Sequence, residues 1–211
     1  GRLTSIVGTV SNTSISFGSA VVINTSTSAT HVASVYDANA QKVVLVATTA
    51  GAPAAFVCTI SGTSVSSGSR VVFGGSNGEQ NRVTYDANAQ KVVVICSYSS
   101  AGRARVGTVS GTSISFGTEA TFQNATIEEP GIAYDASAQK VVIVYKNSGN
   151  SDYGTAIVGT VSGTSISFGT EYVFESAASS SIAIAFDPIN SGKFVVAYKL
   201  TNGHAKVGTV S

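Results

Sequence analysis

The chain has 211 residues, of which only 11% are charged, and its formal net charge is +1. It contains no basic run that could follow a phosphate backbone, so we do not expect it to bind nucleic acid. It contains no apolar stretch as long as a membrane span, so we expect no membrane-spanning segment. A chain of this size can bury roughly 70% of its unfolded surface, which favours one domain over residues 1–211.

Two sequence signatures recur along the chain. Relatives of VYDANAQKVVLV place an aspartate, at intervals of 49, 49 and 52 residues, at Asp37, Asp86, Asp135 and Asp187. Relatives of VGTVSGTSISFG begin at Val7, Val57, Val106 and Val158, with a truncated copy at Val207. A period of about fifty residues is typical of repeat architectures. The repeats cover approximately residues 1–31, 32–81, 82–130, 131–181 and 182–211, of which the first and last are partial.

Each complete repeat predicts four short strands, which in the third repeat span residues 131–134, 140–146, 154–161 and 164–174. The second strand, KVVIVYK, is almost continuously apolar and is expected to be buried on both faces. The fourth alternates apolar and polar residues and is expected to be half-buried. Between the first two strands stands the repeated aspartate, which we expect to cap its own turn with backbone hydrogen bonds. Between the last two stands Gly163, a residue that permits a tight hairpin.

Four antiparallel strands repeated at this period predict an all-β fold, a β-propeller with four blades. We expect the two chain ends to close the ring: the C-terminal repeat supplies the first two strands of the last blade, and residues 13–23 supply its fourth. The third strand is then offered twice, by the segment from Leu3 to Val10 and by the segment from Ala205 to Val210. The surplus copy is either an edge extension or a strand donated to a neighbouring molecule, which would build a homo-oligomer. The natural chain could also continue beyond Ser211 with more blades.

The loops at one end of the predicted blades are almost identical between repeats, whereas those at the other end differ. Binding residues favour variable loops on a rigid frame. The varied loops carry amides, carboxylates and an aromatic ring that could hold sugar hydroxyls, and we expect a ligand to bind among Asn77, Glu79, Gln80, Asn81, Arg82, Asn124, Glu128, Glu129, Asn150, Asp152, Tyr153, Asn202 and His204. Loops without any ligand are the alternative.

Catalytic and metal sites are not expected. Each repeated aspartate lacks the additional oxygen ligands that calcium needs, so we predict no metal site and no cofactor. Glu128 and Glu129 are adjacent and would point apart on a strand, which disfavours a glycoside hydrolase. The histidines, His31 and His204, do not occupy matched positions, and no hydrolase motif accompanies them. Cys58 and Cys96 are expected to be buried small apolar residues, with a disulfide between them as the alternative.

The pair VGTVSGTSISFGT and AYDASAQKVVIVY resembles repeats of large surface and fibre-like structural proteins of marine bacteria and their viruses. The resemblance covers essentially the whole chain and implies a propeller module for attachment or assembly, outside the cell or on a virion surface. We therefore predict a non-catalytic surface module that binds a glycan or a surface receptor. The alternative is a building block that polymerises by strand exchange at the chain ends.

Overall fold

A computed structural model describes residues 1–26, 28–189 and 192–210, and this part of the chain is all-β. None of the described residues forms a helix with the length and apolar character needed to cross a membrane. The N-terminal strands are β1 (Leu3–Ser5), β2 (Gly8–Ser11), β3 (Ser14–Phe17) and β4 (Val21–Asn24). The C-terminal strands are β20 (Ser180–Phe186), β21 (Lys193–Lys199) and β22 (Gly203–Thr209).

Three complete repeats lie between these ends. The first forms β5 (Thr30–Asp37), β6 (Lys42–Thr49), β7 (Ala52–Ser61), β8 (Ser64–Ser67) and β9 (Val71–Val72). The second forms β10 (Glu79–Asp86), β11 (Lys91–Tyr98), β12 (Ala101–Ser110), β13 (Ser113–Phe116) and β14 (Ala120–Gln123). The third forms β15 (Ile127–Asp135), β16 (Lys140–Asn147), β17 (Tyr153–Ser162), β18 (Ser165–Phe168) and β19 (Tyr172–Ala178).

Each complete repeat is one antiparallel sheet. Four strands follow one another in chain order, as in β15–β16–β17–β18, and a fifth, β19, pairs with another part of β17. The single fourth strand expected over residues 164–174 is therefore two strands. It breaks after Phe168, where Gly169 begins the link to β19. The N-terminal strands pair as β1–β4 and β2–β3, and the C-terminal strands form the sheet β20–β21–β22.

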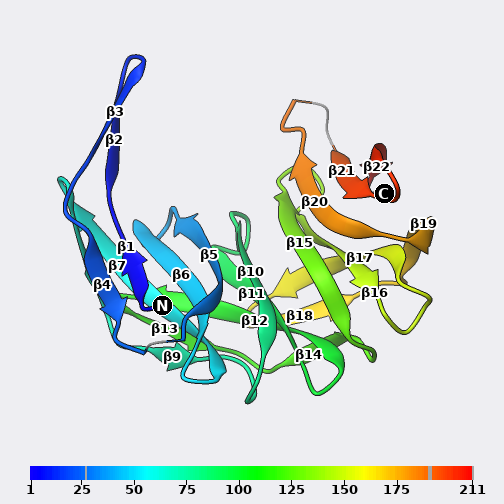
Figure 1. Cartoon of the computed structure of the whole chain (residues 1–211), viewed down its shortest axis with the longest axis horizontal. Coiled ribbons are helices and arrows are strands. Elements are labelled where there is room, and N and C mark those ends of the chain that lie inside the picture. The colour runs from blue at the N-terminus through cyan, green and yellow to red at the C-terminus, as the bar shows by residue number, and fades with distance from the viewer. Residues whose placement is uncertain (27, 190–191, 211) are drawn as a thin grey trace.

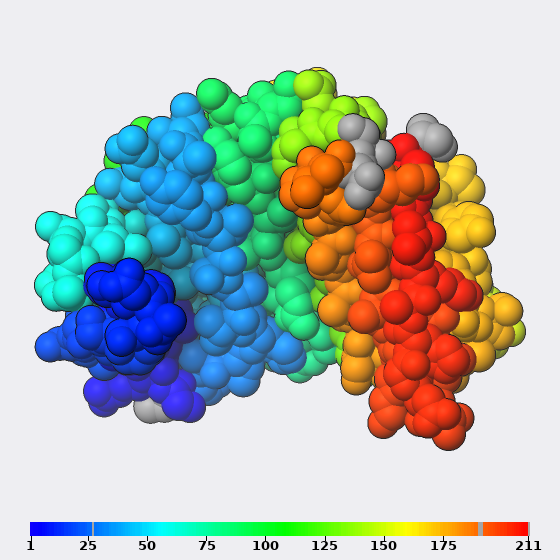
Figure 2. Space-filling model, turned by 90° about the horizontal axis from the view of Figure 1, so that it is seen from above, coloured from blue at the N-terminus to red at the C-terminus, as the bar shows by residue number. Residues whose placement is uncertain are grey.

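The sheets follow one another along an arc, with the N-terminal strands at one end and the β20–β21–β22 sheet at the other (Figures 1 and 2). The leading strands β5, β10, β15 and β20 each contact the next. Apolar cores fill the spaces between neighbouring sheets. Strand β6 supplies two of them, since Leu45 belongs to the core shared with the N-terminal strands and Val44 to the core shared with the second repeat. The near-continuous apolar sequence of this strand follows from burial on both faces.

Neighbouring repeats also touch backbone to backbone at the repeated turns. Gly18, Gly68 and Gly117 lie against the carbonyl oxygens of Thr63, Thr112 and Thr164, each in the hairpin turn of the following repeat. A Cβ atom on Gly117 would lie 1.9 Å from the Thr164 oxygen, far inside van der Waals contact. Glycine is therefore required at these positions, because the carbonyl oxygen of the neighbouring repeat leaves no room for a side chain. The hairpin turns use positive φ instead, at Gly62, Gly111 and Gly163 and, in the first hairpin, at Asn12.

Candidate functional site

The two ends of the sheets differ in how their polar side chains are used. At the repeated-turn end, the aspartates bind their own turns: Asp37 Oδ1 accepts the amide of Ala40 at 2.9 Å, and Asp86 Oδ1 accepts that of Ala89 at the same distance. Asp135 Oδ1 accepts the amides of Ser137 and Ala138, and Asp187 Oδ1 accepts that of Ile189. Among the described residues, no group of three or more histidine, cysteine or acidic side chains could hold a metal ion.

The varied end carries a β-bulge in the leading strand of every repeat. The pairing register shifts between Thr30 and Ala33, and equivalent shifts occur in β10, β15 and β20. One residue in each bulge has a positive φ, between 49° and 59°: His31, Gln80, Glu129 and Ser181. Positive φ is uncommon for residues other than glycine, and bulges re-aim side chains at functional sites. We call these four residues the bulge row.

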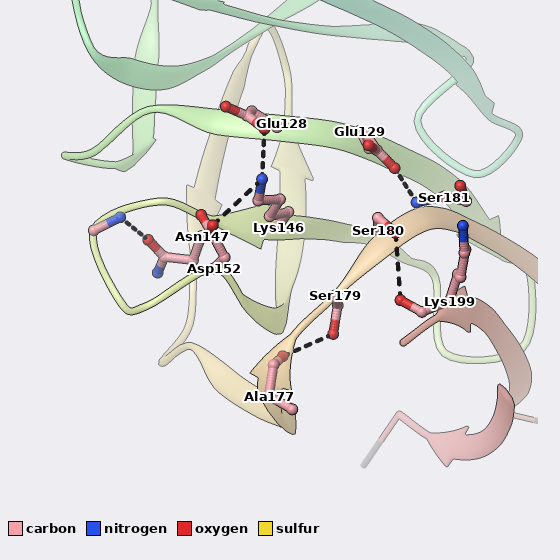
Figure 3. A network of polar contacts seen from close by, with 11 residues as sticks. Glu128, Glu129, Lys146, Asn147, Asp152, Ala177, Ser179, Ser180, Ser181 and Lys199 are labelled. Atoms are coloured by element: carbon pink, nitrogen blue, oxygen red, sulfur yellow. Dashed lines mark hydrogen bonds and ion pairs between the residues drawn. The ribbon is translucent and has the colours of Figure 1, made fainter. Parts of the chain in front are cut away.

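The four residues of the bulge row lie on the leading strands β5, β10, β15 and β20, each of which contacts the next. Glu129 on β15 reaches the next repeat and accepts a hydrogen bond from the backbone amide of Ser181 on β20 (Figure 3). At the other end of the row, His31 Nδ1 lies 3.1 Å from the hydroxyl oxygen of Thr30. The row thus presents one imidazole, one amide, one carboxylate and one hydroxyl group at matched positions. Gln80 and Glu129 were expected as binding residues, but His31 and Ser181 were not.

The third repeat adds a charged group beside Glu129. Lys146 Nζ lies 2.8 Å from Glu128 Oε2 and 3.4 Å from Asp152 Oδ2 (Figure 3). The hydrogen bond with Glu128 raises the pKa of Lys146 above its ordinary value, against the opposing effect of burial. The Asp152 loop is anchored by buried Asn147, whose Oδ1 accepts the amide of Gly149 at 3.0 Å. Glu128 on β15 and Asp152 on the anchored loop therefore share the ammonium group of Lys146 on β16.

Asn81 and Arg82 serve the structure of the second repeat. The side chain of Asn81 is fully buried, and its Nδ2 donates a hydrogen bond to Thr48 Oγ1 at 2.9 Å. Arg82 donates to the Asn81 carbonyl oxygen at 2.8 Å, and burial lowers the pKa of its guanidinium. Asn81 was expected to bind ligand, but its burial leaves it unreachable from the surface. It lies within the bulge between Glu79 and Arg82, where its side chain is turned towards the interior.

The remaining expected residues are spread over the varied end. Asn77, Glu79, Asn124 and Asn150 are exposed, and Tyr153 is half-buried. Asn202 and His204 belong to the last sheet, at one end of the arc, where the His204 ring stacks on Tyr198 with centroids 5.6 Å apart. The structure therefore does not gather all thirteen expected residues into one place. It brings together Glu128 and Asp152 through Lys146, and it aligns Gln80 with Glu129.

A separate polar cluster lies on the second sheet. Glu119 bridges Arg103 at 3.0 Å and Arg105 at 3.5 Å, and it accepts the hydroxyl of Tyr98. Burial and then this hydrogen bond raise the pKa of Tyr98 to about 12. Arg103 also lies 5.2 Å from the centre of the Tyr98 ring. The carboxylate is thus committed to groups of its own sheet.

No protein-family profile matches the chain. A search of curated proteins likewise found no match.

Proposed function

We propose that the chain is a non-catalytic β-propeller-type surface module that attaches to a glycan through the bulge row and the polar loops beside it. In this arrangement each complete sheet is one blade, the leading strands line the axis, and the module works outside the cell or on a virion surface. The resemblance of the repeats to those of marine bacterial and viral surface proteins supports the same role. A protein receptor is the alternative partner at this face.

The observation that carries the proposal is the bulge row itself. The scaffold places one side chain per repeat at the same bulged position, yet the four side chains are chemically different. A purely structural bulge needs no such variety, whereas a surface that recognises an irregular polar ligand does. The repeated-turn end, by contrast, uses its aspartates to cap its own turns.

The chemistry of the row suits sugar hydroxyl groups. A carboxylate accepts hydrogen bonds, an amide both donates and accepts, and imidazole and hydroxyl groups do either. Neighbouring hydroxyls of a sugar ring offer the complementary mixture of donors and acceptors. Exposed Asn150 and half-buried Tyr153 extend this polar surface in the third repeat. Loops held by internal hydrogen bonds, as around Asn147, lose little conformational freedom when a ligand binds.

A glycan array probed with the intact chain and three variants tests the proposal. Gln80→Ala and His31→Ala remove two members of the row, and Glu129→Gln keeps an oxygen for the Ser181 amide while removing the charge. We expect the intact chain to bind a defined set of glycans and each variant to bind them about tenfold more weakly, the value of one good hydrogen bond or slightly more.

Asn88→Ala is the matched control, since Asn88 is exposed at the repeated-turn end. It should leave glycan binding unchanged. Equal binding by the intact chain and all three bulge variants would remove the bulge row from recognition. Absence of any bound glycan, together with binding to protein-bearing cell surfaces stripped of sugars, would favour the receptor alternative.

A further inference from the structure

An apolar cavity lies between the third sheet and the last sheet. It has a volume of about 570 Å³. Val158 and Phe174 line it from the third repeat, and Phe194, Val196 and Val207 line it from the last. Val207 is largely exposed there. An open cavity with this lining leaves apolar surface in contact with water, which costs free energy.

In the other interfaces between complete repeats, the corresponding space is filled by the first half of the following repeat's fourth strand. Ile114 of β13 belongs to the core between the first and second repeats, and Ile166 of β18 to the core between the second and third. Phe168 packs beside Phe122 with ring centroids 5.6 Å apart. Among the described residues, the sheet β20–β21–β22 has no strand that corresponds to β13 and β18.

One strand of the chain has the missing sequence and does not bury it. Strand β3 reads Ser-Ile-Ser-Phe, as do β13 and β18. Ile15 is 58% exposed and Phe17 is 61% exposed, whereas Ile114 is 3% and Ile166 is 6% exposed. The β2–β3 hairpin projects from the end of the arc opposite the cavity (Figure 1). The same side chains that complete one interface are thus open to solvent at the other end.

Two further contacts are open at matching positions. Gly169 is the counterpart of Gly117, but a Cβ atom on Gly169 would have only the carbonyl oxygen of Val158 within 4 Å, at 3.9 Å, among the described residues. The residue that corresponds to Thr164 in the β2–β3 turn is Thr13. Tyr36 is also 55% exposed. Its counterpart Tyr85 instead contacts the turn of the preceding repeat, through the amide of Asn39.

We propose that the β2–β3 hairpin of a second copy of this chain fills the cavity, with Ile15 and Phe17 inserted and Thr13 seated on Gly169. Strand β3 pairs with β2 as β18 pairs with the end of β17, so β2 of the second copy takes the place held by Gly208 and Thr209 at the end of β22, and that end gives way. A second copy is favoured over the chain's own hairpin because hairpin and cavity lie at opposite ends of the arc. Bringing them together would bend three close-packed cores, whereas a second copy docks without bending them.

Such a contact is head-to-tail, because it joins two different surfaces. Each copy that donates its hairpin still offers its own cavity, so copies assemble into closed rings or open chains. This assembly is independent of glycan binding at the bulge row. It includes an exchange within the duplicated segments, since Gly8 and Thr9 replace Gly208 and Thr209, but the side chains that fill the cavity come from β3.

Sedimentation of the intact chain over a range of concentrations tests the proposal. We expect oligomers that dissociate on dilution, and a monomer for Ile15→Asp and for Phe17→Asp. Ser16→Asp adds the same charge to the opposite face of the same strand and should leave the oligomers intact. Both apolar targets are exposed, so the variants should keep the circular dichroism spectrum and melting temperature of the monomer. A monomer at every concentration of the intact chain would overturn the proposal.

Cross-linking identifies which copy supplies the hairpin. Chains carrying only Thr13→Cys are mixed with chains carrying only Thr170→Cys, which lies beside Gly169, and a short bismaleimide is added. The native Cys58 and Cys96 are buried, and burial raises the pKa of both thiols, so they should not react. We expect a cross-linked pair made of one chain of each kind. A double variant that cross-links only within single chains would show a closed ring and overturn the second-copy arrangement.

The cavity side has its own test in Gly169→Ala. The added methyl group meets no described atom closer than 3.9 Å in the single chain but would meet the Thr13 carbonyl in the assembly. We expect normal folding and at least a tenfold loss of association. Unchanged association of this variant would rule out the proposed seating of Thr13.

Discussion

The phenol oxygen of Tyr134 lies 3.2 Å from the backbone nitrogen of Asn88, in the turn of the preceding repeat, and accepts its hydrogen bond. Burial raises the pKa of Tyr134, and the neighbouring Asp86 carboxylate adds to the increase. In the last repeat Phe186 stands at the position of Tyr134, and Asp135 Oδ2 is buried without a hydrogen-bond partner among the residues that the structure describes. The interface between the third and last repeats therefore lacks the hydroxyl group that Tyr134 supplies between the second and third repeats.

Phe186→Tyr should therefore stabilise the fold. The new hydroxyl group would lie beside Asp135, whose buried oxygen could accept its hydrogen bond, and one such bond is worth about 1 kcal/mol. For a chain of this size that corresponds to a rise in melting temperature of about 2–4 °C. Thermal unfolding followed by circular dichroism measures it. Tyr36→Phe is the control at an exposed position and should change little; a destabilised Phe186→Tyr chain would contradict the prediction.

Gly117→Ala should destabilise the fold strongly. Its methyl group would overlap the Thr164 carbonyl oxygen, so the hairpin turn of the third repeat must move, at a cost of about 1–3 kcal/mol or more. Gly169→Ala, at the matched position without this contact, should cost less than about 1 kcal/mol in the monomer. Urea unfolding of dilute samples compares the two. Equal costs would mean that the turn adjusts freely.

Asn81→Ala should alter stability and leave ligand binding unchanged. The substitution removes the hydrogen bond to Thr48 and leaves a small cavity, together about 1–3 kcal/mol. Asn124→Ala, at an exposed position of the corresponding connection in the next repeat, should stay within about 0.5 kcal/mol of the parent chain. Urea unfolding and the glycan array separate the two effects. Loss of binding without loss of stability would return Asn81 to the recognition surface.

Glu175 should make stability depend on pH in the acid range. Hydrogen bonds from Tyr198 and then Lys206 lower the pKa of Glu175 below its ordinary value. A carboxyl group whose pKa falls on folding stabilises fully above its unfolded pKa, and the contribution is lost as the pH falls through the folded value. The stability difference between the parent chain and Glu175→Gln should therefore shrink as the pH drops below about 4.3. Urea unfolding at several pH values measures this difference, and a constant difference would contradict the assignment.

The period of the sequence was enough to predict antiparallel all-β units, since strands such as β16 are almost wholly apolar. The sequence did not predict the break at Gly169, because a glycine is equally compatible with a turn and with a close contact to a neighbouring backbone. The approach to Thr164 at the matched Gly117 becomes visible only when two repeats are packed. The propeller and its blade count remain predictions.

The bulge row escaped prediction for a different reason. Positive φ is signalled by glycine or asparagine, whereas the bulges carry His31, Gln80, Glu129 and Ser181. Their backbone is set by pairing with the second strand of each sheet, a long-range constraint that local residue preference does not record. The burial of Asn81 escaped prediction for the same reason, because a shift of one residue in register sends a side chain from surface to interior.

The bulge row has a consequence for how such proteins can diversify. Each position in the row belongs to one repeat, and the two junctions between complete repeats share the same turn contacts. Recombination between complete repeats could therefore delete, duplicate or reorder whole units while retaining the contacts between neighbouring repeats. Each event would rewrite the order of imidazole, amide, carboxylate and hydroxyl along the row, so new specificities could arise without any point mutation.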